Sequence, residues 1–450
     1  MLIKNLFRFW TYQVFSPGTV LREKYESFKA LLEHDKAAHE FMAALEDMYY
    51  TPEKYDFQAV VTTYEHLGAS VSEMVDALLK MCPSSHWSLK DYYKKFDFYN
   101  RFMLAPPEFD FSPPFTIRFN TGESLNETIA GKKAFSLFHL NQELHLPIPA
   151  GFVITTNAFH YFLEANDLQK PINRHLSDLD VNSPSSLEET AERIEQLILN
   201  AAMPEEIAMA VTSAVNDFGP VEKNFRAALR SSAVKEDGKA SFAGQYKTLL
   251  NVKKKDILNG YKQVVAGKYS SQALYYRVNH GILDSETPMA VLVLEMIDSK
   301  SSGVMYTKDP EDTMSDNLLI HSAWGQGELL VEGGVSPDLI KVSKKNPDTI
   351  LSTKTSAKQN QTVLEPGLQA RTIQTDPREK DLLSLDEASA LTLAGWSILL
   401  ENHFKEPQDI EWCQDQKGRL FILQSRPLNI HPARVPKTLK KRLPVTLMLG

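Results

Sequence analysis

The stretch Gln408-Asp409-Ile410-Glu411-Trp412, followed by Leu423-Gln424-Ser425-Arg426-Pro427, predicts an antiparallel β-hairpin. The intervening Asp415-Gln416-Lys417-Gly418 has the composition of a tight turn, and both flanks alternate as strands do. Asp409 and Glu411 should lie on one face of the first strand because side chains repeat every two residues. With a four-residue loop, we expect Asp409 to pair opposite Gln424 and Glu411 to lie within diagonal reach of it.

Two acids, an amide oxygen and a guanidinium therefore converge on one patch of this predicted sheet. Neighbouring carboxylates repel each other unless a cation joins them, and hard oxygen ligands of this kind suit Mg²⁺. An arginine such as Arg426 beside them suits phosphate. The hairpin thus predicts a magnesium site formed by Asp409, Glu411 and Gln424. The alternative is an exposed polar sheet face with a surface ion pair.

The bulk composition limits the class of protein. The chain has 450 residues, 43% of them hydrophobic, which is enough for two or three domains. A formal net charge of −8 argues against general affinity for nucleic acid. Cys82 and Cys413 cannot form a disulfide framework or a zinc site, and no apolar run is long enough to span a membrane. We expect a soluble, cytoplasmic protein without nucleic-acid or membrane partners.

Residues 1–105 are predicted to form an all-helical N-terminal domain. Apolar residues follow helical spacing, Gly68 is expected to end one helix, and Ser70-Val71-Ser72-Glu73 has the form of a capping box for the next. This region carries no motif with a chemical function. A structural or docking role is the interpretation that follows.

A proline-rich linker at residues 106–114 separates this region from a part of mixed α and β character at 115–430. We expect the latter to contain two subdomains, at about 115–285 and 286–430.

Within the mixed part, Met289 to Ile297 is a near-continuous apolar run typical of a buried strand, and Gly303-Val304-Met305-Tyr306 is expected to form a second strand beside it. Residues 431–450 are interpreted as a linker or as the start of a truncated next domain, since their last residues resemble a strand that is cut off.

Three motifs indicate phosphate binding. Gly131-Lys132-Lys133-Ala134 precedes a predicted helix, whose N-terminus adds positive potential for phosphate oxygens. Leu229-Arg230-Ser231-Ser232-Ala233 offers a guanidinium and hydroxyl donors. Ser241-Phe242-Ala243-Gly244-Gln245 has the small residues of a flexible flap. The alternatives are a surface lysine near a helix start and an ordinary polar loop.

A fourth motif is rich in glycine, which lets the backbone approach a ligand closely. It comprises Trp324-Gly325-Gln326-Gly327-Glu328 and then Gly333-Gly334-Val335-Ser336-Pro337-Asp338. The alternative here is a pair of tight turns.

In this order, and together with Pro-x-Pro-x-Gly-Phe-Val-Ile-Thr-Thr and Ser-Gly-Val-Met-Tyr-Thr, the motifs resemble the N-terminal nucleotide-binding region of phosphoenolpyruvate synthase, the pyruvate, water dikinase family. The resemblance covers roughly residues 125 to 428. It implies an α+β or α/β fold, with an ATP-grasp-type nucleotide-binding domain of two subdomains. It also implies ATP and Mg²⁺ as cofactors, with ATP held between the subdomains.

The resemblance also implies roles for individual residues. Lys133 would hold ATP phosphates, Arg230 would neutralise the transferring groups, and Arg426 would lie on the phosphates. Glu411 and Gln424, with Asp409 near them, would hold Mg²⁺. The remaining nucleotide-binding residues implied are Ser231, Ser241, Gly244, Gln245 and Glu328. The family often has glutamine at the position of Leu294, which changes the contacts expected on the adenine side.

One family feature is missing from the sequence. The family passes a phosphoryl group from ATP to a histidine in a Gly-Gly-x-Thr-Ser-His-Ala-like segment, and none of the 12 histidines here has that context. The chain is therefore expected to be a fragment, or to work with a separate subunit that supplies the phosphohistidine domain.

The resulting hypothesis is a dikinase module that transfers a phosphoryl or pyrophosphoryl group to that histidine, with pyruvate as the final acceptor by family analogy. Two alternatives stay open. One is a related dikinase for an antibiotic, a phenol or a glucan. The other is a nucleotide-sensing regulatory subunit that docks a partner through its helical region.

Overall fold

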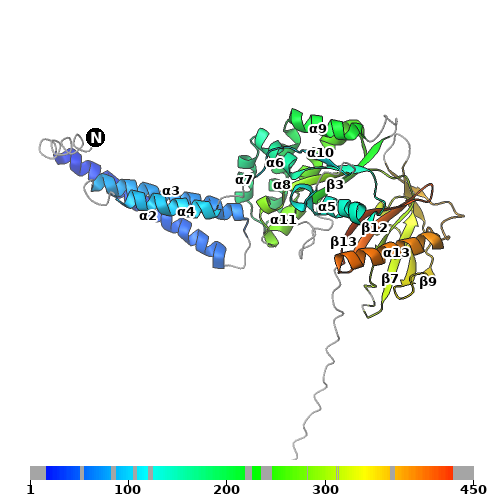
Figure 1. The fold of residues 1–450 in the computed structure, drawn as a ribbon. Helices are drawn as coiled ribbons and strands as arrows, with labels where there is room; N and C mark the ends of the chain where they lie inside the picture. The colour runs from blue at the N-terminus through cyan, green and yellow to red at the C-terminus, as the bar shows by residue number, and fades with distance from the viewer. Residues whose placement is uncertain are drawn as a thin grey trace, which may run out of the picture. The chain divides into compact units, whose positions relative to one another are not determined.

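The computed structural model describes residues 17–50, 55–82, 88–104, 109–119, 125–217, 225–234, 246–280, 282–310, 312, 314–364 and 370–428. The chain divides into two compact units. The first contains Met1–Phe135 and Ala150–Glu295, and the second contains Ser136–Pro149 and Met296–Gly450. Figure 1 labels their elements. None of the described helices is long and apolar enough to cross a membrane.

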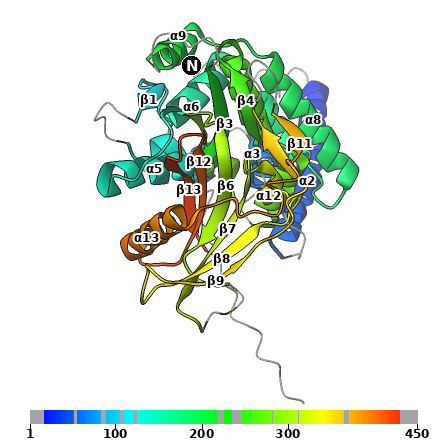
Figure 2. The same ribbon diagram turned by 90° about the vertical axis from the view of Figure 1, so that its right-hand side faces the viewer.

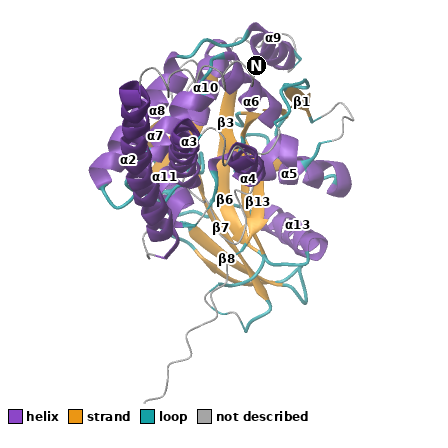
Figure 3. Ribbon diagram, turned by 90° about the vertical axis from the view of Figure 1, so that its left-hand side faces the viewer, coloured by secondary structure: helices purple, strands orange, loops and turns teal. Residues whose placement is uncertain are grey.

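The first unit begins with three long helices, α2 (Pro17–Tyr50), α3 (Phe57–Met81) and α4 (Ser88–Leu104). Helices α2 and α3 pack along each other, as Figure 3 shows in purple. Asp56 caps α3 by accepting a hydrogen bond from the backbone N–H of Gln58 at 2.8 Å. Helical periodicity in this region is thus confirmed. Whether residues 1–105 fold as a separate domain stays a prediction.

The predicted break at Gly68 is wrong, because α3 runs through it and through Ser70 without interruption. The glycine serves packing instead. The hydroxyl of Tyr93 in α4 donates to the carbonyl of Gly68 at 2.8 Å, and a Cβ at this position would lie 3.3 Å from Asp97 Oδ1. A side chain there would require the Asp97 carboxylate to shift slightly, so the glycine lies in the contact between two helices rather than at a helix end.

The rest of the first unit is built on a five-stranded antiparallel sheet, with strand order β1-β2-β5-β3-β4. Figure 2 labels β1, β3 and β4 of this sheet. The strands are β1 (Thr116–Arg118), β2 (Gly151–Ile154), β3 (Arg226–Ala233), β4 (Thr248–Lys253) and β5 (Met289–Glu295). The predicted buried strand is confirmed, since every residue of β5 except Glu295 is buried.

One face of this sheet packs on a hydrophobic core that includes Leu229, Val291 and Val293. Helices line this core: α6 (Thr156–Ala165), α7 (Gln169–Ser177), α8 (Pro184–Asn200), α9 (Glu205–Asn216), α10 (Ile257–Gly267) and α11 (Ser271–Asn279). Two short 3-10 turns, Lys254–Asp256 and Asp284–Glu286, flank α10 and β5. By strand alternation, Arg230 and Ser232 lie on the opposite face, where Ser232 contacts the first part of α5 (Glu127–Leu144).

The second unit contains a six-stranded antiparallel sheet of order β13-β12-β6-β7-β8-β9. Its strands are β6 (Ser299–Tyr306), β7 (Asn317–Trp324), β8 (Asp338–Ser343), β9 (Ile350–Lys354), β12 (Gln408–Asp415) and β13 (Leu420–Pro427). Helix α13 (Glu387–Phe404) packs against β7, β8 and β12, as Figure 2 shows. The unit also has a short α12 (Glu328–Val331) and a two-stranded ribbon of β10 (Asn360–Val363) and β11 (Arg371–Gln374).

The prediction that the strand at Gly303–Tyr306 lies beside the strand at Met289–Ile297 is wrong. β6 pairs with β7 and β12 in the second unit, whereas β5 lies between β2 and β3 in the first. Both edges of β5 already carry a neighbouring strand, so no backbone donors or acceptors remain there for β6.

Alternation along β12 directs Ile410 and Trp412 to the apolar side of the second sheet, where both are fully buried. Gly303 on β6 makes room for the indole, because a Cβ on this glycine would lie 2.6 Å from a Trp412 ring carbon. The opposite alternation leaves Asp409 and Glu411 on the other face, as the sequence predicts.

Candidate functional site

In the first unit, the candidate site begins at a break in helix α5. Gly131 has φ 71° and ψ 167°, so the helix is interrupted there and starts again at Lys132. A Cβ on Gly131 would lie 1.6 Å from the carbonyl oxygen of Ser232, which no L side chain tolerates. The predicted helix start is confirmed in this sense, although one extra helical turn, from Glu127, precedes it.

Ser232 joins this helix start to strand β3. Its hydroxyl donates to the carbonyl of Ala130 at 2.8 Å and accepts from the backbone N–H of Ala134 at 2.9 Å. The contact connects residues 98 positions apart in sequence. It brings the Gly-Lys-Lys-Ala and Arg-Ser-Ser-Ala motifs into one structure at a helix N-terminus, where the backbone carries positive potential.

The two lysines of the motif have different surroundings. Lys133 Nζ lies 3.5 Å from the hydroxyl of Ser231, whereas Lys132 Nζ lies 3.4 Å from a carboxylate oxygen of Glu127. Arg230 precedes Ser231 on β3, on the face opposite the apolar core, and is partly exposed. The structure thus brings Lys133 next to Ser231, and Arg230 is the preceding residue of the same strand.

The same sheet face carries Leu294 of β5, which pairs with Ala228 and is 3% exposed. The predicted flap residues Ser241, Gly244 and Gln245 lie outside the described residues. The sequence prediction missed Ser232 as a positioning residue. The second hydroxyl of the Arg-Ser-Ser motif was the available signal, but its partner at Ala134 can be found only in three dimensions.

In the second unit, β12 and β13 form the predicted hairpin. Its predicted register is wrong by two residues, because Asp409 pairs with Arg426 and Glu411 pairs with Gln424. One residue comes from the turn, since Gln414 pairs with Leu420 and the N–H of Asp415 donates to the carbonyl of Arg419 at 2.9 Å. The other comes from a bulge after Glu411 that skips Leu423. The two one-residue shifts add to two, so Gln424 and Arg426 still share a face of the sheet with Asp409 and Glu411, as predicted.

The hairpin side chains form an ion pair within the sheet. Arg426 donates from Nε and Nη2 to one oxygen of Asp409 at 2.9 and 2.8 Å, with the two side chains 30% and 12% exposed. Tyr306 lies beside Asp409 on β6, and burial together with that carboxylate raises the pKa of the phenol. Asp409 thus orients Arg426. Whether it also reaches a metal stays a prediction.

Glu411 and Gln424 are the better matched oxygen donors for a hard cation. They face each other directly across the two strands, on the side of the sheet away from Trp412. A carboxylate and an amide oxygen in this arrangement are ligands that Mg²⁺ accepts. Glu328, at the start of α12, is partly buried, and burial together with nearby Glu332 raises the pKa of its carboxyl.

The glycine-rich motif of the second unit consists largely of turns. Gly325 and Gly333 have φ of 77° and 74°, and a Cβ on Gly325 would lie 2.3 Å from the carbonyl oxygen of Thr362. Asp338 is fully buried and accepts from Lys358 Nζ at 2.5 Å and from the Ser384 hydroxyl at 2.8 Å. Asp338 is thus a buried anchor of this segment, and a nucleotide-binding role for Glu328 stays a prediction.

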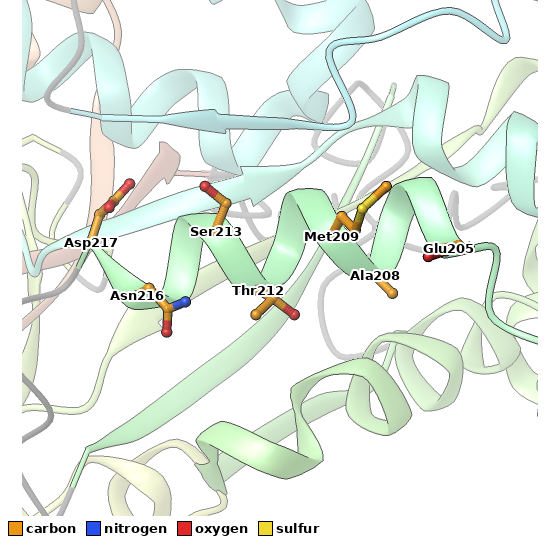
Figure 4. A pocket seen from close by; sticks show the side chains of 7 residues that line it. All are labelled: Glu205, Ala208, Met209, Thr212, Ser213, Asn216 and Asp217. Atoms are coloured by element: carbon orange, nitrogen blue, oxygen red, sulfur yellow. The ribbon is translucent and has the colours of Figure 1, made fainter.

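Two other features carry no chemistry. Figure 4 shows a hollow along α9, lined by side chains such as Thr212 and Asp217 that come from one helix and its end, so no groups converge on it from several elements. Cys413 is buried, and burial raises the pKa of its thiol to about 12, which keeps it protonated and unreactive.

Comparisons with known proteins identify the family of the chain. Residues 127–445 match the family described as the pyruvate phosphate dikinase AMP/ATP-binding domain. A probable phosphoenolpyruvate synthase of Methanocaldococcus jannaschii is 34% identical over 306 residues, covering 67% of this chain and 25% of that protein. The phosphoenolpyruvate synthase of Deinococcus radiodurans is 32% identical over 335 residues, covering 72% and 42%.

The enzyme of Escherichia coli with the same name is 33% identical over 293 residues, covering 62% of this chain and 37% of that protein. The chain thus spans less than half the length of these relatives. Among solved structures, D-alanyl-alanine synthetase A of Vibrio cholerae matches 58% of this chain and 63% of its own at 11% identity, but the TM-score of 0.20 is too low to identify a shared fold. The chain belongs to the pyruvate phosphate dikinase AMP/ATP-binding domain family and is similar to the N-terminal region of phosphoenolpyruvate synthases.

Proposed function

We propose that this chain is the nucleotide-binding module of a dikinase. It binds Mg·ATP and delivers a phosphoryl or pyrophosphoryl group to a histidine on another domain or subunit. The observation that carries the proposal is the contact of Ser232 with Ala130 and Ala134, which holds the Lys133 segment against the strand of Arg230. The family match supports the same interpretation.

The proposed phosphate contacts are cationic. Lys133 is the second residue after the glycine at a helix restart, so its ammonium lies near the positive potential of a helix N-terminus. Arg230 adds a guanidinium, which binds phosphate oxygens through two parallel hydrogen bonds. Their role is to neutralise charge on the transferring groups, since phosphoryl transfer depends mainly on positioning and electrostatic stabilisation.

The second unit would supply the metal ligands. Glu411 and Gln424 fit Mg²⁺ because both present oxygen donors and face each other in the hairpin register. When bound, the ion supplies further positive charge against the phosphates. Arg426, held by Asp409, would approach a phosphate from the neighbouring pair of the same hairpin.

The acceptor histidine and the final substrate follow from the relatives alone. Proteins named phosphoenolpyruvate synthase align with this chain, so pyruvate is the proposed final acceptor. An ATP-grasp-type nucleotide-binding fold of two subdomains is part of the same proposal. A related dikinase with another acceptor would use the same residues up to the histidine.

The phosphate assignment is tested by titrating the chain with ATP and with adenosine in a calorimeter, with and without Mg²⁺. Lys133→Ala should weaken ATP binding about ten- to a hundredfold, the equivalent of a charge-assisted hydrogen bond of roughly 1.5–3 kcal/mol, and should leave adenosine unchanged. Lys132→Ala is the matched control, since its ammonium pairs with Glu127 and should change ATP affinity little. Equal weakening of ATP and adenosine by Lys133→Ala contradicts the assignment.

The reaction class is tested by product analysis. The chain is incubated with Mg·ATP and with the phosphohistidine domain of the Escherichia coli relative added in trans. A dikinase splits the bond between the α and β phosphates and leaves AMP. ADP would instead indicate a simple kinase or ATPase.

A nucleotide-sensing subunit is the second candidate, and one observation favours it. Helices α2 and α4 expose large aromatic side chains, including Tyr25, Tyr92 and Phe96 at 64%, 60% and 67%. A sensor would bind ATP but form neither AMP nor ADP in the product analysis.

A further inference from the structure

A cluster of metal-binding side chains lies in the second unit, on residues that the proposed nucleotide site does not use. His139 and Glu143 are four residues apart on α5 and therefore share one face of the helix. His403 lies near the end of α13. Among the described residues, no other group of three histidine, cysteine or acidic side chains comes this close together.

The distances suit a small cation. One ligand atom from each residue lies within 4.8 Å of the other two. His139 Nε2 is 3.3 Å and His403 Nε2 is 3.9 Å from the same carboxylate oxygen, Oε2 of Glu143. Ligands about 2.0–2.2 Å from a tetrahedral zinc ion stand roughly 3.3–3.5 Å apart. The distance from His139 Nε2 to Glu143 Oε2 already has this length, and a small side-chain rotation would shorten the other two distances.

We propose that His139, Glu143 and His403 form a Zn²⁺ site that links α5 to α13. Two imidazoles and one carboxylate are a ligand set that borderline metals such as zinc bind well, and a hard oxygen-seeking ion such as Mg²⁺ does not favour it. The fourth coordination position is left for water or a small ligand.

The chain offers an internal comparison with an ordinary helical acid–histidine pair. On α2, His39 Nδ1 lies 3.6 Å from an oxygen of Asp35, four residues earlier. That pair has the same spacing but is a solvent-exposed contact within one helix. The cluster on α5 differs because a third ligand arrives from a helix more than two hundred residues later in the sequence, with its ring 5.1 Å from that of His139.

The experiment is a zinc titration of the full chain after removal of metal by a chelator. It is performed in excess Mg²⁺ and without nucleotide, so that oxygen-rich sites are already filled. We expect one high-affinity zinc per chain, and we expect Co²⁺ in its place to give the intense visible absorption of a four-coordinate ion. Zinc should also raise the Tm of the chain, since a ligand that binds only the folded state stabilises it.

Three single substitutions test the ligands: His139→Ala, His403→Ala and Glu143→Gln. Each should weaken zinc binding at least roughly tenfold, because loss of even an outer hydrogen-bond partner of a zinc ligand costs about 10–100-fold. His39→Ala is the control and should leave affinity and the cobalt spectrum unchanged. Zinc affinity that is unaffected by all three substitutions, or no binding above that of the triple variant, overturns the proposal.

Discussion

At the scale of single residues, the candidate site depends on positions that accept only one kind of residue. Gly131 lies in the left-handed region with the Ser232 carbonyl against it, so the backbone there admits only glycine. The hydroxyl of Ser232 forms hydrogen bonds on both sides of the break in α5. The conformation of the segment that carries Lys133 is therefore fixed by two small residues rather than by the lysine itself.

We expect Gly131→Ala to destabilise the chain by about 1–3 kcal/mol, the magnitude typical of backbone strain at such a position, and to weaken ATP binding. Chemical denaturation and calorimetry measure the two effects. Gly395→Ala is the matched control in helix α13, where a Cβ would meet nothing within 4 Å, and it should stabilise by about 0.5–1 kcal/mol. An unchanged denaturation midpoint for Gly131→Ala would contradict the described conformation.

His160 makes stability depend on pH. Burial, and then the nearby charge of Lys268, lower the pKa of His160 from its ordinary 6.5 to about 4, and its ring stacks on Phe109 with centroids 4.1 Å apart. Because the folded imidazole resists protonation, the unfolded chain binds more protons between these two values. Stability from this group is present above about pH 6.5 and is lost as the pH falls towards 4.

We expect His160→Phe to remove this pH dependence, which amounts to about 3 kcal/mol at most. The phenyl ring keeps the stack on Phe109 but cannot titrate. Denaturation curves recorded from pH 4 to 7 measure the effect, with His280→Phe at an exposed helix end as the control. If the variant and the parent chain lose stability equally on acidification, other groups are responsible.

At the scale of elements, the β12–β13 hairpin shows how two local irregularities combine. The turn and the bulge each shift the pairing by one residue, and together they restore the face of every side chain. Had only one occurred, Gln424 and Arg426 would have lain on the apolar face of the sheet, with Ile410 and Trp412. The bulge therefore protects the polar face of the hairpin.

The hairpin also contains two arginine–carboxylate pairs that differ in burial. We expect Arg426→Ala to cost about 1–3 kcal/mol, below the roughly 3–5 kcal/mol of a fully buried pair, because Arg426 is 30% exposed while Asp409 is only 12% exposed. Arg419→Ala, in the pair with Asp415 near the turn, should cost about 0.2–1 kcal/mol because Arg419 is 67% exposed. Urea denaturation of both variants measures the difference, and equal losses would show that burial does not set the strength of these pairs.

At the scale of the whole molecule, the N-terminal helices contact the body of the first unit. Thr62 of α3 and Ser177 of α7 share a hydrogen bond of 2.8 Å. Asp56, at the start of α3, is buried, and this burial raises the pKa of its carboxyl against the opposing charge of Arg277. These contacts are distant in sequence from the Lys133 and Arg230 segments, so the helices are expected to stabilise the unit without binding nucleotide.

We expect a shortened chain of residues 109–450 to bind Mg·ATP with an affinity close to that of the full chain. Its solubility should be lower, because removal of α3 uncovers surface on α7. Calorimetry with ATP, after circular dichroism has verified folding, provides the measurement. A well-folded shortened chain that does not bind ATP would show that the helices help to form the site.

Local sequence determined the elements that depend on periodicity and on conformationally special residues. The apolar run of β5, the alternation of the hairpin and the glycine before Lys133 identify their structures because each signal is contained within a few residues. Only the tertiary structure decided the register of the hairpin, the sheet that contains β6, the passage of α3 through Gly68 and the contact between Ser232 and Ala134. Each of these depends on which partner surface is available in three dimensions. Packing between distant segments overrides the local propensity of single residues, so a short stretch of sequence does not determine these features.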